Sequence, residues 1–514
     1  MKNTKQIIIA LLIMFSTSIY AQENKGIDFE KLDTYLNKAL TEWGIPGMSV
    51  AVVQGDSIAF EKGYGVKEYG KEGKVDSKTL FAVASNTKSF TSASLSQLVA
   101  EGKIKWDDKV TDYLPWFKMY NNYVTGEMTI RDLLCHRSGL KTFSGDLLWY
   151  ETNYTAKEVI ERARFLKPEY GFRSHFGYSN IMFSAAGQII PAVTGIEWKD
   201  YVKNHFFKTL GMKNSLISVS EIKPNMNIAI PHHTAPEIKP LPIKYMQWDN
   251  VAPAAAIISN VEDMSQWLIL QMNKGIYKGD TILDANEVWE MHSTQTPDNS
   301  SEAWLKYFPT KHFSTYGLGW SLFDYQGVKV VNHGGGADGM ISQTMFVPEE
   351  KFGIVVLTNS INYLPTAMMY YILEDYFGDT TKDWSKFYKM VYDYGQKMHK
   401  NDEDKKNKNR VLNTKPSLKL EDYTGTYGGD LYGNAEVTIK DEHLVLNFLP
   451  SDVLIGDLSH WHYDTFEIKL RNSPTLPKGQ VQFIIGVDGK VEELKVNIPN
   501  PDFFFDELEF KKIK

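Results

Sequence analysis

The sequence predicts an α+β fold, in which an antiparallel sheet flanked by helices and an all-α region is followed by a small all-β barrel or sandwich domain. Strand patterns stand on both sides of a long helix-rich stretch, and a sheet assembled from such distant segments belongs to an α+β unit. Beyond residue 416 the pattern changes to short alternating runs, typical of small β domains. With 514 residues, 43% of them hydrophobic, the chain can bury a large core.

The first elements are a helix and a hairpin. Apolar residues between 29 and 43 recur with the helical period, and Gly44-Ile-Pro-Gly47 ends that helix. Two strands are predicted next, at 49–53 and 57–60, joined at Gln54-Gly55-Asp56.

Helical patterns dominate the middle of the chain. One begins at Ser85 and continues to about Ala100, where Gly102 follows. Residues 105–300 mix helical stretches with Gly- and Pro-rich connections, and two helices stand out there, at 156–165 and 261–272 with Asn260 as N-cap. After them, strands are predicted at 317–323, 328–332, 343–347 and 353–358, and a helix at 366–377.

The end of the chain differs in composition from the rest. Residues 396–415 are rich in Lys, Asn and Asp, which predicts a solvated linker. Asp488-Gly489 is a strong hairpin signal among the alternating runs that follow, at 436–440, 443–448, 465–470 and 480–485. The predicted parts are therefore a leader at 1–21, a first domain at 22–395, a linker at 396–415 and a β domain at 416–514.

The N-terminus has the pattern of a secretory signal peptide. Lys2 and Lys5 precede the apolar run from Ile7 to Phe15, and a small-residue cleavage site follows at Ala21. The run is too short to span a bilayer, so we expect a cleaved leader and a periplasmic or secreted protein. A buried N-terminal helix is the alternative.

Charge and cysteine content exclude other classes. Loss of the leader removes two lysines, which moves the formal net charge from −7 to −9 and disfavours nucleic-acid binding. Cys135 is the only cysteine, so no intramolecular disulfide can form. We expect Cys135 to be a small buried residue, with a catalytic thiol as the alternative.

The stretch Phe81-Ala-Val-Ala-Ser-Asn-Thr-Lys-Ser-Phe90 places Ser85 and Lys88 three residues apart at the start of a predicted helix. Residues at this spacing share a helical face, so the hydroxyl and the amine can form a hydrogen bond. A lysine that burial keeps neutral can take the proton of a serine nucleophile. The alternative is an N-cap serine beside a solvated lysine.

The same spacing occurs twice more, and local context argues against both. Gly139 lies inside the instance that begins at Ser138, in a predicted turn. Pro224 follows the instance that begins at Ser220 and disfavours helical geometry in the residue before it. Only Ser85 and Lys88 begin a helix.

Two further stretches could complete a site. Tyr178-Ser179-Asn180 lies in a glycine-containing loop, where a tyrosine can pass a proton between nucleophile and leaving group. His333-Gly334-Gly335-Gly336 ends a predicted strand, and an amide there can stabilise an oxyanion together with the amide of Ser85. The alternatives are an interfacial tyrosine and a glycine-rich turn with a surface histidine.

Together these stretches resemble the serine β-lactamase and penicillin-binding protein superfamily, whose signatures are Ser-x-x-Lys, a Ser- or Tyr-initiated loop motif and Lys-Thr-Gly. The Tyr-x-Asn and His-Gly-Gly forms are similar to its class C branch (peptidase S12-type), which includes D-aminopeptidases, D-Ala carboxypeptidases and esterases. The resemblance covers about residues 28–378, and the tail after 416 resembles the lipocalin-like β domains of some relatives. Other matching stretches are Ile45-Pro-Gly-Met-Ser-Val50, Thr129-Ile-Arg-Asp-Leu-Leu-Cys-His-Arg-Ser-Gly-Leu140, Pro253-Ala-Ala-Ala-Ile-Ile-Ser259 and Tyr316-Gly-Leu-Gly-Trp320.

This resemblance implies roles for individual residues. Ser85 would be the acylated nucleophile, Lys88 its base, and Tyr178 an aid to proton transfer. Asn180 would orient the substrate amide, and the Ser85 and Gly336 amides would form the oxyanion hole. The implied substrate-binding and oxyanion positions are Asn180, His333, Gly335 and Gly336.

Three departures from the family pattern bear on the substrate. His333 replaces the lysine usual in true β-lactamases, and a neutral imidazole should recognise a substrate carboxylate more weakly. Phe143 stands near the position where penicillin-hydrolysing class C enzymes carry a polar amide residue, and Ala254-Ala255 replaces a glycine pair. Together they argue against an efficient antibiotic-destroying enzyme.

The sequence therefore predicts a secreted or periplasmic serine hydrolase that acts through a Ser85 acyl-enzyme on small amide, peptide (including D-amino-acid-containing) or ester substrates. One alternative is a D-Ala-D-Ala carboxypeptidase or weak β-lactamase on cell-wall-like substrates, and another is a catalytically silent penicillin-binding-like sensor or binding protein. We expect a small-molecule or peptide substrate, no nucleic acid and no membrane span; the oligomeric state stays open.

No cofactor and no metal site is predicted. The histidine pairs His232-His233 and His460-Trp-His462 lack the companion ligands that zinc requires. A phosphate loop and a dinucleotide fingerprint are also missing from the sequence.

Overall fold

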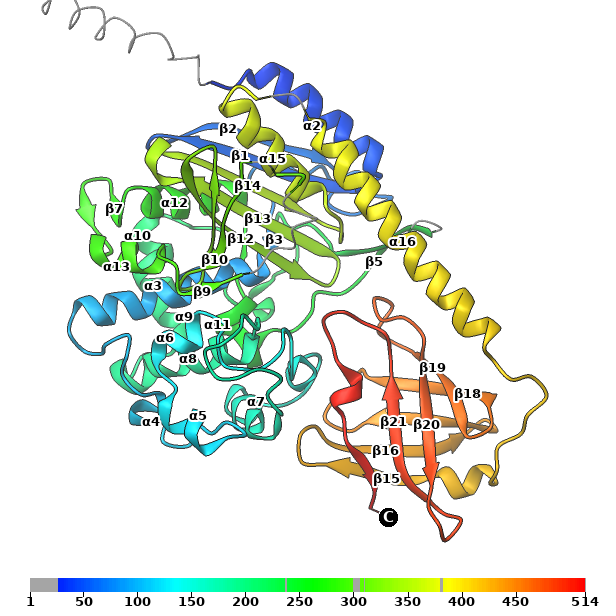
Figure 1. Ribbon diagram of the computed structural model, residues 1–514. Helices are drawn as coiled ribbons and strands as arrows, with labels where there is room; N and C mark the ends of the chain where they lie inside the picture. The colour runs from blue at the N-terminus through cyan, green and yellow to red at the C-terminus, as the bar shows by residue number, and fades with distance from the viewer. Residues whose placement is uncertain (1–25, 236–237, 299–305, 309, 380–381, 514) are drawn as a thin grey trace, which may run out of the picture.

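The computed structural model describes residues 26–235, 238–298, 306–308, 310–379 and 382–513. Figure 1 shows a larger part, built on a sheet with helices around it, and a β-barrel at the C-terminal end that a long helix joins to it. The predicted leader lies outside the described residues. Among the helices described, none is long and apolar enough to cross a membrane.

An antiparallel sheet of eight strands forms the centre of the larger part, in the order β2-β1-β14-β13-β12-β11-β10-β9. The N-terminal hairpin therefore pairs with β14, from the far end of the domain, which confirms the predicted sheet of distant segments. The strands are β1 (Gly47–Gln54), β2 (Ser57–Gly65), β9 (Thr296–Pro297), β10 (Ser314–Tyr316), β11 (Ser321–Tyr325), β12 (Val328–Ala337), β13 (Met340–Val347) and β14 (Phe352–Thr358).

Both faces of this sheet are covered. Side chains alternate between the faces of a strand, and in β14 Val356 joins the cluster that contains α2 (Phe29–Trp43) and α15 (Leu364–Tyr376). Its neighbour Val355 joins the opposite cluster, which includes α12 (Val261–Met272). A strand buried on both faces needs a continuous apolar run, which explains the sequence of β14.

Helix ends follow the predicted capping signals. The Asn260 side chain accepts a hydrogen bond from the amide of Asp263 and begins α12 at the predicted residue. Gly44, with φ +66°, ends α2 in the left-handed conformation. The other helices of this part are α3 (Thr87–Ala100), α4 (Val110–Tyr113), α5 (Asn122–Glu127), α6 (Ile130–Leu134), α7 (Ala156–Arg162), α8 (Asn180–Thr194), α9 (Trp198–Val202), α10 (Lys208–Leu210), α11 (Ala252–Ala255) and α13 (Ala285–Met291). Separate two-stranded sheets pair β3 (Phe81–Ala82) with β6 (Ile258–Ser259), β4 (His232–Ala235) with β5 (Ile238–Pro242), and β7 (Ile276–Tyr277) with β8 (Asp280–Thr281).

The structure corrects one predicted strand. Residues 317–323 are not continuous, because β10 ends at Tyr316 and β11 begins at Ser321. Gly319, with φ +78°, makes the turn between them, and a side chain there would come within 2.6 Å of Ser92 Oγ on α3. The glycine is thus needed both for its conformation and for close packing.

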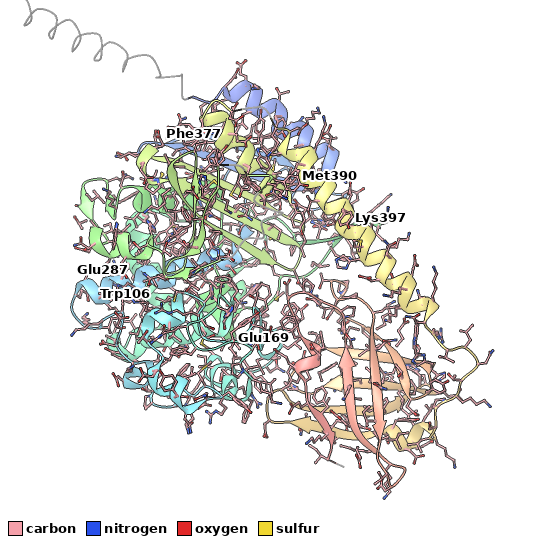
Figure 2. All side chains as sticks on the ribbon, in the orientation of Figure 1. Trp106, Glu169, Glu287, Phe377, Met390 and Lys397 are labelled. Atoms are coloured by element: carbon pink, nitrogen blue, oxygen red, sulfur yellow. The ribbon has the colours of Figure 1, made fainter. Side chains whose placement is uncertain are left out.

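The predicted linker at 396–415 also differs from the structure. Its first part belongs to α16 (Trp384–Lys408), a helix of 25 residues, along which Figure 2 marks Met390 and Lys397. A charged run without proline can continue a helix, since Lys, Glu and Gln are good helix formers. Beyond the helix, Arg410 donates hydrogen bonds to the carbonyl oxygens of Trp461 and His460, so this segment stays in contact with the barrel.

The C-terminal domain is a closed barrel rather than a sandwich. Its interior is filled by apolar and aromatic side chains, among them Phe448, Phe466 and Phe483. The turn at Asp488-Gly489 connects two strands as predicted, with Gly489 at φ +78°. The strands are β15 (Gly425–Gly429), β16 (Gly433–Lys440), β17 (His443–Phe448), β18 (Ile455–His462), β19 (Thr465–Leu470), β20 (Gly479–Ile485), β21 (Val491–Asn497) and β22 (Phe510–Lys512).

One edge of the barrel contacts the larger part close to Phe143. Glu507 accepts hydrogen bonds from Ser144 Oγ at 2.7 Å and from the amide of Gly145 at 2.8 Å. Phe503 packs on Tyr150, with ring centroids 4.0 Å apart. The two domains therefore share a packed interface.

Candidate active site

Ser85 is presented by a tight turn between β3 and α3. It lies in the 3-10 helix η1 (Ala84–Asn86), and Ala84 before it has φ +45°, a left-handed conformation that costs a non-glycine residue energy. Every other residue from Phe81 to Phe90 is buried, whereas Ser85 is half-buried. The turn thus makes the hydroxyl accessible within a buried segment.

Lys88, one turn further on, is completely buried. Its Nζ lies 3.0 Å from Ser85 Oγ, 2.6 Å from Asn180 Oδ1 and 3.0 Å from the carbonyl oxygen of Ala254. Burial lowers the pKa of Lys88 to about 7, and the carboxyl group of Asp146 opposes this shift. A large fraction of Lys88 is therefore a neutral amine near neutral pH.

The three neighbours determine where the lone pair of that amine points. A neutral amine has two N–H bonds and one lone pair. The carbonyl oxygen of Ala254 and Asn180 Oδ1 can only accept hydrogen bonds, so they take the two N–H groups. The lone pair of Lys88 is left for the hydroxyl of Ser85, as a general base requires.

Tyr178 completes the group around the serine. Its hydroxyl forms a hydrogen bond with Ser85, and its ring lies 4.7 Å from Lys88 Nζ. Burial raises the pKa of Tyr178, so it remains a phenol that donates a proton rather than a phenolate. The backbone around Tyr178 is tied to the neighbouring loop, because its carbonyl oxygen accepts a hydrogen bond from the amide of Phe143.

Asn180 begins α8 and connects Lys88 to a residue that the sequence analysis missed. Ser179 caps this helix by accepting a hydrogen bond from the amide of Met182. Asn180 Nδ2 donates to Asp146 Oδ2 at 2.7 Å. This residue is Asp146. Its position just before the apolar run Leu147 to Tyr150 was the available sequence signal for a buried carboxyl group, but Gly145-Asp146 also suits an ordinary turn.

His136 is a second residue that the sequence analysis did not single out. It is fully buried, its ring lies 4.1 Å from that of Tyr178, and its Nδ1 accepts a hydrogen bond from the amide of Ser179 at 3.1 Å. Burial and the positive charge of Lys88 lower its pKa well below the usual value. His136 is therefore neutral and supports the loop of Tyr178.

His333 lies in β12 and is buried and neutral. Burial lowers its pKa to about 3. Its Nδ1 lies 2.7 Å from the carbonyl oxygen of Gly334, and its Nε2 lies 2.8 Å from the hydroxyl of Tyr316. Both ring nitrogens thus have partners within the protein, and the substrate contact of this side chain stays a prediction.

The glycines after His333 bring the strand close to the serine. A Cβ on Gly335 would lie 2.1 Å from the carbonyl oxygen of Val83 and 3.0 Å from the amide nitrogen of Ser85. Gly336, the next residue, is exposed. Only a glycine at 335 permits this approach of β12 to the Ser85 amide, and the oxyanion role of Gly336 remains a prediction.

Two other candidates do not belong to this group. Cys135 is buried, and burial raises the pKa of its thiol to about 11, so the thiol stays protonated. Within the described ranges no cluster of three or more His, Cys, Asp or Glu side chains could hold a metal ion.

The sheet, the accessible serine and its buried lysine define a class of protein, the serine hydrolases of the β-lactamase fold. A family model described as "Beta-lactamase" matches residues 32–368, more than half of the chain, and the chain belongs to this family. A second model, described as "Domain of unknown function (DUF3471)", matches residues 409–512, which include the barrel.

Two curated relatives match most of the chain's length. The chain is 28% identical over 445 residues to "Unguisins hydrolase ungD'" of Aspergillus campestris, covering 80% of this chain and 78% of the relative. It is 27% identical over 345 residues to "Protein flp" of Staphylococcus aureus, covering 65% of this chain and 64% of that protein.

Solved structures share the fold. The octameric penicillin-binding protein homologue from Pyrococcus abyssi has a TM-score of 0.61 at 20% identity and covers 95% of this chain and 100% of its own. The D-amino acid amidase from Ochrobactrum anthropi SV3 has a TM-score of 0.55 at 23% identity and covers 67% and 98%.

Proposed function

We propose that the protein is a periplasmic or secreted hydrolase that forms an acyl-enzyme on Ser85 with small amides, peptides or esters. The observation that carries the proposal is the buried Lys88, whose two N–H groups are held by Asn180 and Ala254 so that its lone pair faces the Ser85 hydroxyl. A serine beside a neutral amine is an activated nucleophile.

Acylation would proceed with named atoms. Ser85 Oγ forms a bond to the substrate carbonyl carbon, and its proton moves to Lys88 Nζ. Tyr178, a phenol near neutral pH, gives its proton to the departing nitrogen or oxygen as the bond from that atom to the carbonyl carbon breaks. It then recovers a proton from the ammonium of Lys88. Water then hydrolyses the ester on Ser85 by the reverse proton path.

Substrates with D-configured residues are one arm of this proposal. The relative named an unguisins hydrolase and the solved D-amino acid amidase support a search among amides and peptides. The neutral and fully engaged His333 disfavours recognition of a substrate carboxylate, and with it a carboxypeptidase or an efficient β-lactamase.

The test is covalent labelling followed by a substrate panel. A fluorophosphonate and a fluorescent penicillin are each added to the folded protein, and the labelled peptide is identified by mass spectrometry. We expect label on Ser85 and none in Ser85→Ala. D- and L-aminoacyl amides, short-chain esters and a chromogenic cephalosporin then give relative rates. A folded protein that neither probe labels would be a binding protein instead.

Secretion is tested separately. Protein recovered from the periplasm or the medium should begin at Gln22 in N-terminal sequencing, because the signal pattern ends at Ala21. A product that retains Met1 in the cytoplasm would contradict this part of the proposal.

A further inference from the structure

Asp146 is a buried carboxyl group without a role in the mechanism above. It begins the 3-10 helix η2 (Asp146–Leu148), and only 2% of its surface is exposed. Oδ1 accepts a hydrogen bond from Trp149 Nε1 at 2.8 Å, and Oδ2 accepts one from Asn180 Nδ2 at 2.7 Å. Both neighbours donate N–H groups, so the arrangement suits a carboxylate, which can only accept.

This contact fixes the direction of the Asn180 amide. An ionised Asp146 holds Nδ2 and so turns Oδ1 toward Lys88 Nζ, 2.6 Å away. If the amide were reversed, its N–H groups would face Lys88 and compete with the Ser85 hydroxyl for the lone pair. The orientation of Asn180 therefore decides whether Lys88 is aimed at the serine.

We propose that Asp146 is a positioning residue for acylation, which acts through Asn180 to aim the lone pair of Lys88 at the Ser85 hydroxyl. Its negative charge also stabilises the ammonium that forms when Lys88 takes the serine proton. This inference rests on the acyl-enzyme function proposed above, and its test is arranged so that the two can fail separately.

The charges around the pair agree with this role. Burial raises the pKa of Asp146 and Asp502 of the barrel adds to the rise, whereas the N–H groups of Trp149 and Asn180 and the nearby Lys88 lower it. Because both oxygens of Asp146 accept N–H hydrogen bonds and Lys88 becomes an ammonium during acylation, the carboxylate is the form that this arrangement stabilises. Around Lys88, the other titratable groups are held neutral by burial: Tyr178, His136 and His333. Among the residues that the structure describes there, Asp146 supplies the charge that favours a protonated Lys88.

The experiment measures the rate of labelling by a fluorophosphonate as a function of pH. In this reaction Ser85 Oγ bonds to phosphorus, the P–F bond breaks, fluoride leaves and the hydroxyl proton goes to Lys88, so no natural substrate is needed. In Asp146→Asn the opposing charge is lost and the pKa of Lys88 falls. The acid limb of the profile should therefore move to lower pH by about one unit or more. The plateau rate should fall about tenfold or more, because Asn180 loses its fixed orientation.

A matched control is Asp263→Asn. Asp263 is also a buried carboxyl group, but the hydrogen bonds that the structure describes for its side chain go to Asn214 and Ser215 rather than to the site residues. We expect its substitution to lower the melting temperature and to leave the acid limb in place. A pure loss of stability would thus look like Asp263→Asn rather than Asp146→Asn.

A second variant keeps the inference testable if Asp146→Asn does not fold. Trp149→Phe keeps an aromatic ring but removes the N–H donor of Asp146, so it should move the acid limb in the same direction by a smaller amount. An unchanged acid limb and plateau in a folded Asp146→Asn protein, or in Trp149→Phe if the first is unfolded, overturns the role of Asp146. If the wild type is not labelled at all, the proposed function fails instead.

Discussion

The catalytic domain and the barrel fill their interiors in opposite ways. At the centre of the catalytic domain lie an amine, a carboxyl group and imidazoles, such as Lys88, Asp146 and His333, all buried. The barrel interior consists of apolar and aromatic side chains such as Phe448 and Phe483. Burying a charged group costs several kcal/mol of folding stability unless the group is paired or neutralised. The polar centre of the catalytic domain therefore costs stability, whereas the apolar interior of the barrel does not.

This difference indicates which interior carries the chemistry. In the catalytic domain Lys88, Asp146 and His333 each have hydrogen-bond partners, and the proposed reaction depends on their protonation states. The barrel meets the loop beside the site at one edge, where Glu507 accepts hydrogen bonds from Ser144 and Gly145. Mutations in the two interiors should therefore separate activity from stability.

The largest effect is expected from Lys88→Met. Loss of the base should reduce the rate of labelling or hydrolysis by about 10²- to 10⁴-fold, while the melting temperature should stay constant or rise because a buried amine is replaced by an apolar chain of similar size. In the wild type the rate should rise with pH through about 7, where Lys88 loses its proton. A Lys88→Met protein that keeps the wild-type rate would show that another group is the base.

The same lysine should also affect stability. Its pKa is lowered by folding from ~10.4 in the unfolded chain to about 7, so the folded state binds fewer protons between these values. The free energy of unfolding of the wild type should therefore rise with pH across this window relative to Lys88→Met. Denaturant titrations at several pH values measure the difference, and parallel curves for the two proteins would contradict it.

An intermediate effect, on stability alone, is expected from Phe483→Ala. This side chain packs against Tyr423, Tyr427 and Phe466 inside the barrel, and removing a buried phenyl ring costs about 3–5 kcal/mol. The labelling rate at temperatures where the protein is folded should not change. Gln482 is an exposed neighbour on the same strand, and Gln482→Ala is the control for both the stability and the labelling rate. A parallel loss of rate would mean that the barrel interior is coupled to the site.

The smallest effect is expected from Glu507→Gln. The substitution weakens two hydrogen bonds between the barrel and the loop that carries Phe143 and Asp146, at a cost on the order of 1 kcal/mol. The labelling rate should fall by less than about tenfold, and melting curves should shift slightly. A loss of rate as large as that of Lys88→Met would place Glu507 in the catalytic machinery and would contradict the separation of activity from stability between the two domains.

Local signals explain most of what could be predicted from the sequence. Ser85 and Lys88 belong to one turn of helix, and α12 begins at a capping asparagine. Asp146 could not be identified in this way, because its importance depends on Asn180, which lies 34 residues away in sequence. The pairing of His333 with Tyr316 joins two different strands and was equally inaccessible.

The long helix was missed for a different reason. A polar, charged stretch has no apolar face along which to recognise a helical period, so composition alone predicted a linker at 396–415. In the structure α16 instead begins against the catalytic domain, where Trp43 Nε1 donates a hydrogen bond to Ser385 Oγ at 3.0 Å. Contacts with a domain at each end of the helix, rather than an apolar periodicity in its sequence, therefore explain why this stretch is helical.

This helix fixes how far the barrel is rotated, about the helix axis, relative to the catalytic domain. With 25 residues it is about 37 Å long, and each residue adds ~1.5 Å of rise and about 100° of rotation. Inserting a single residue would rotate the barrel away from the position in which Glu507 contacts Ser144. Inserting a whole helical turn would keep the orientation of the barrel but shift it along the helix axis. The number of residues in α16, more than their identity, therefore sets the angle at which the barrel faces the site.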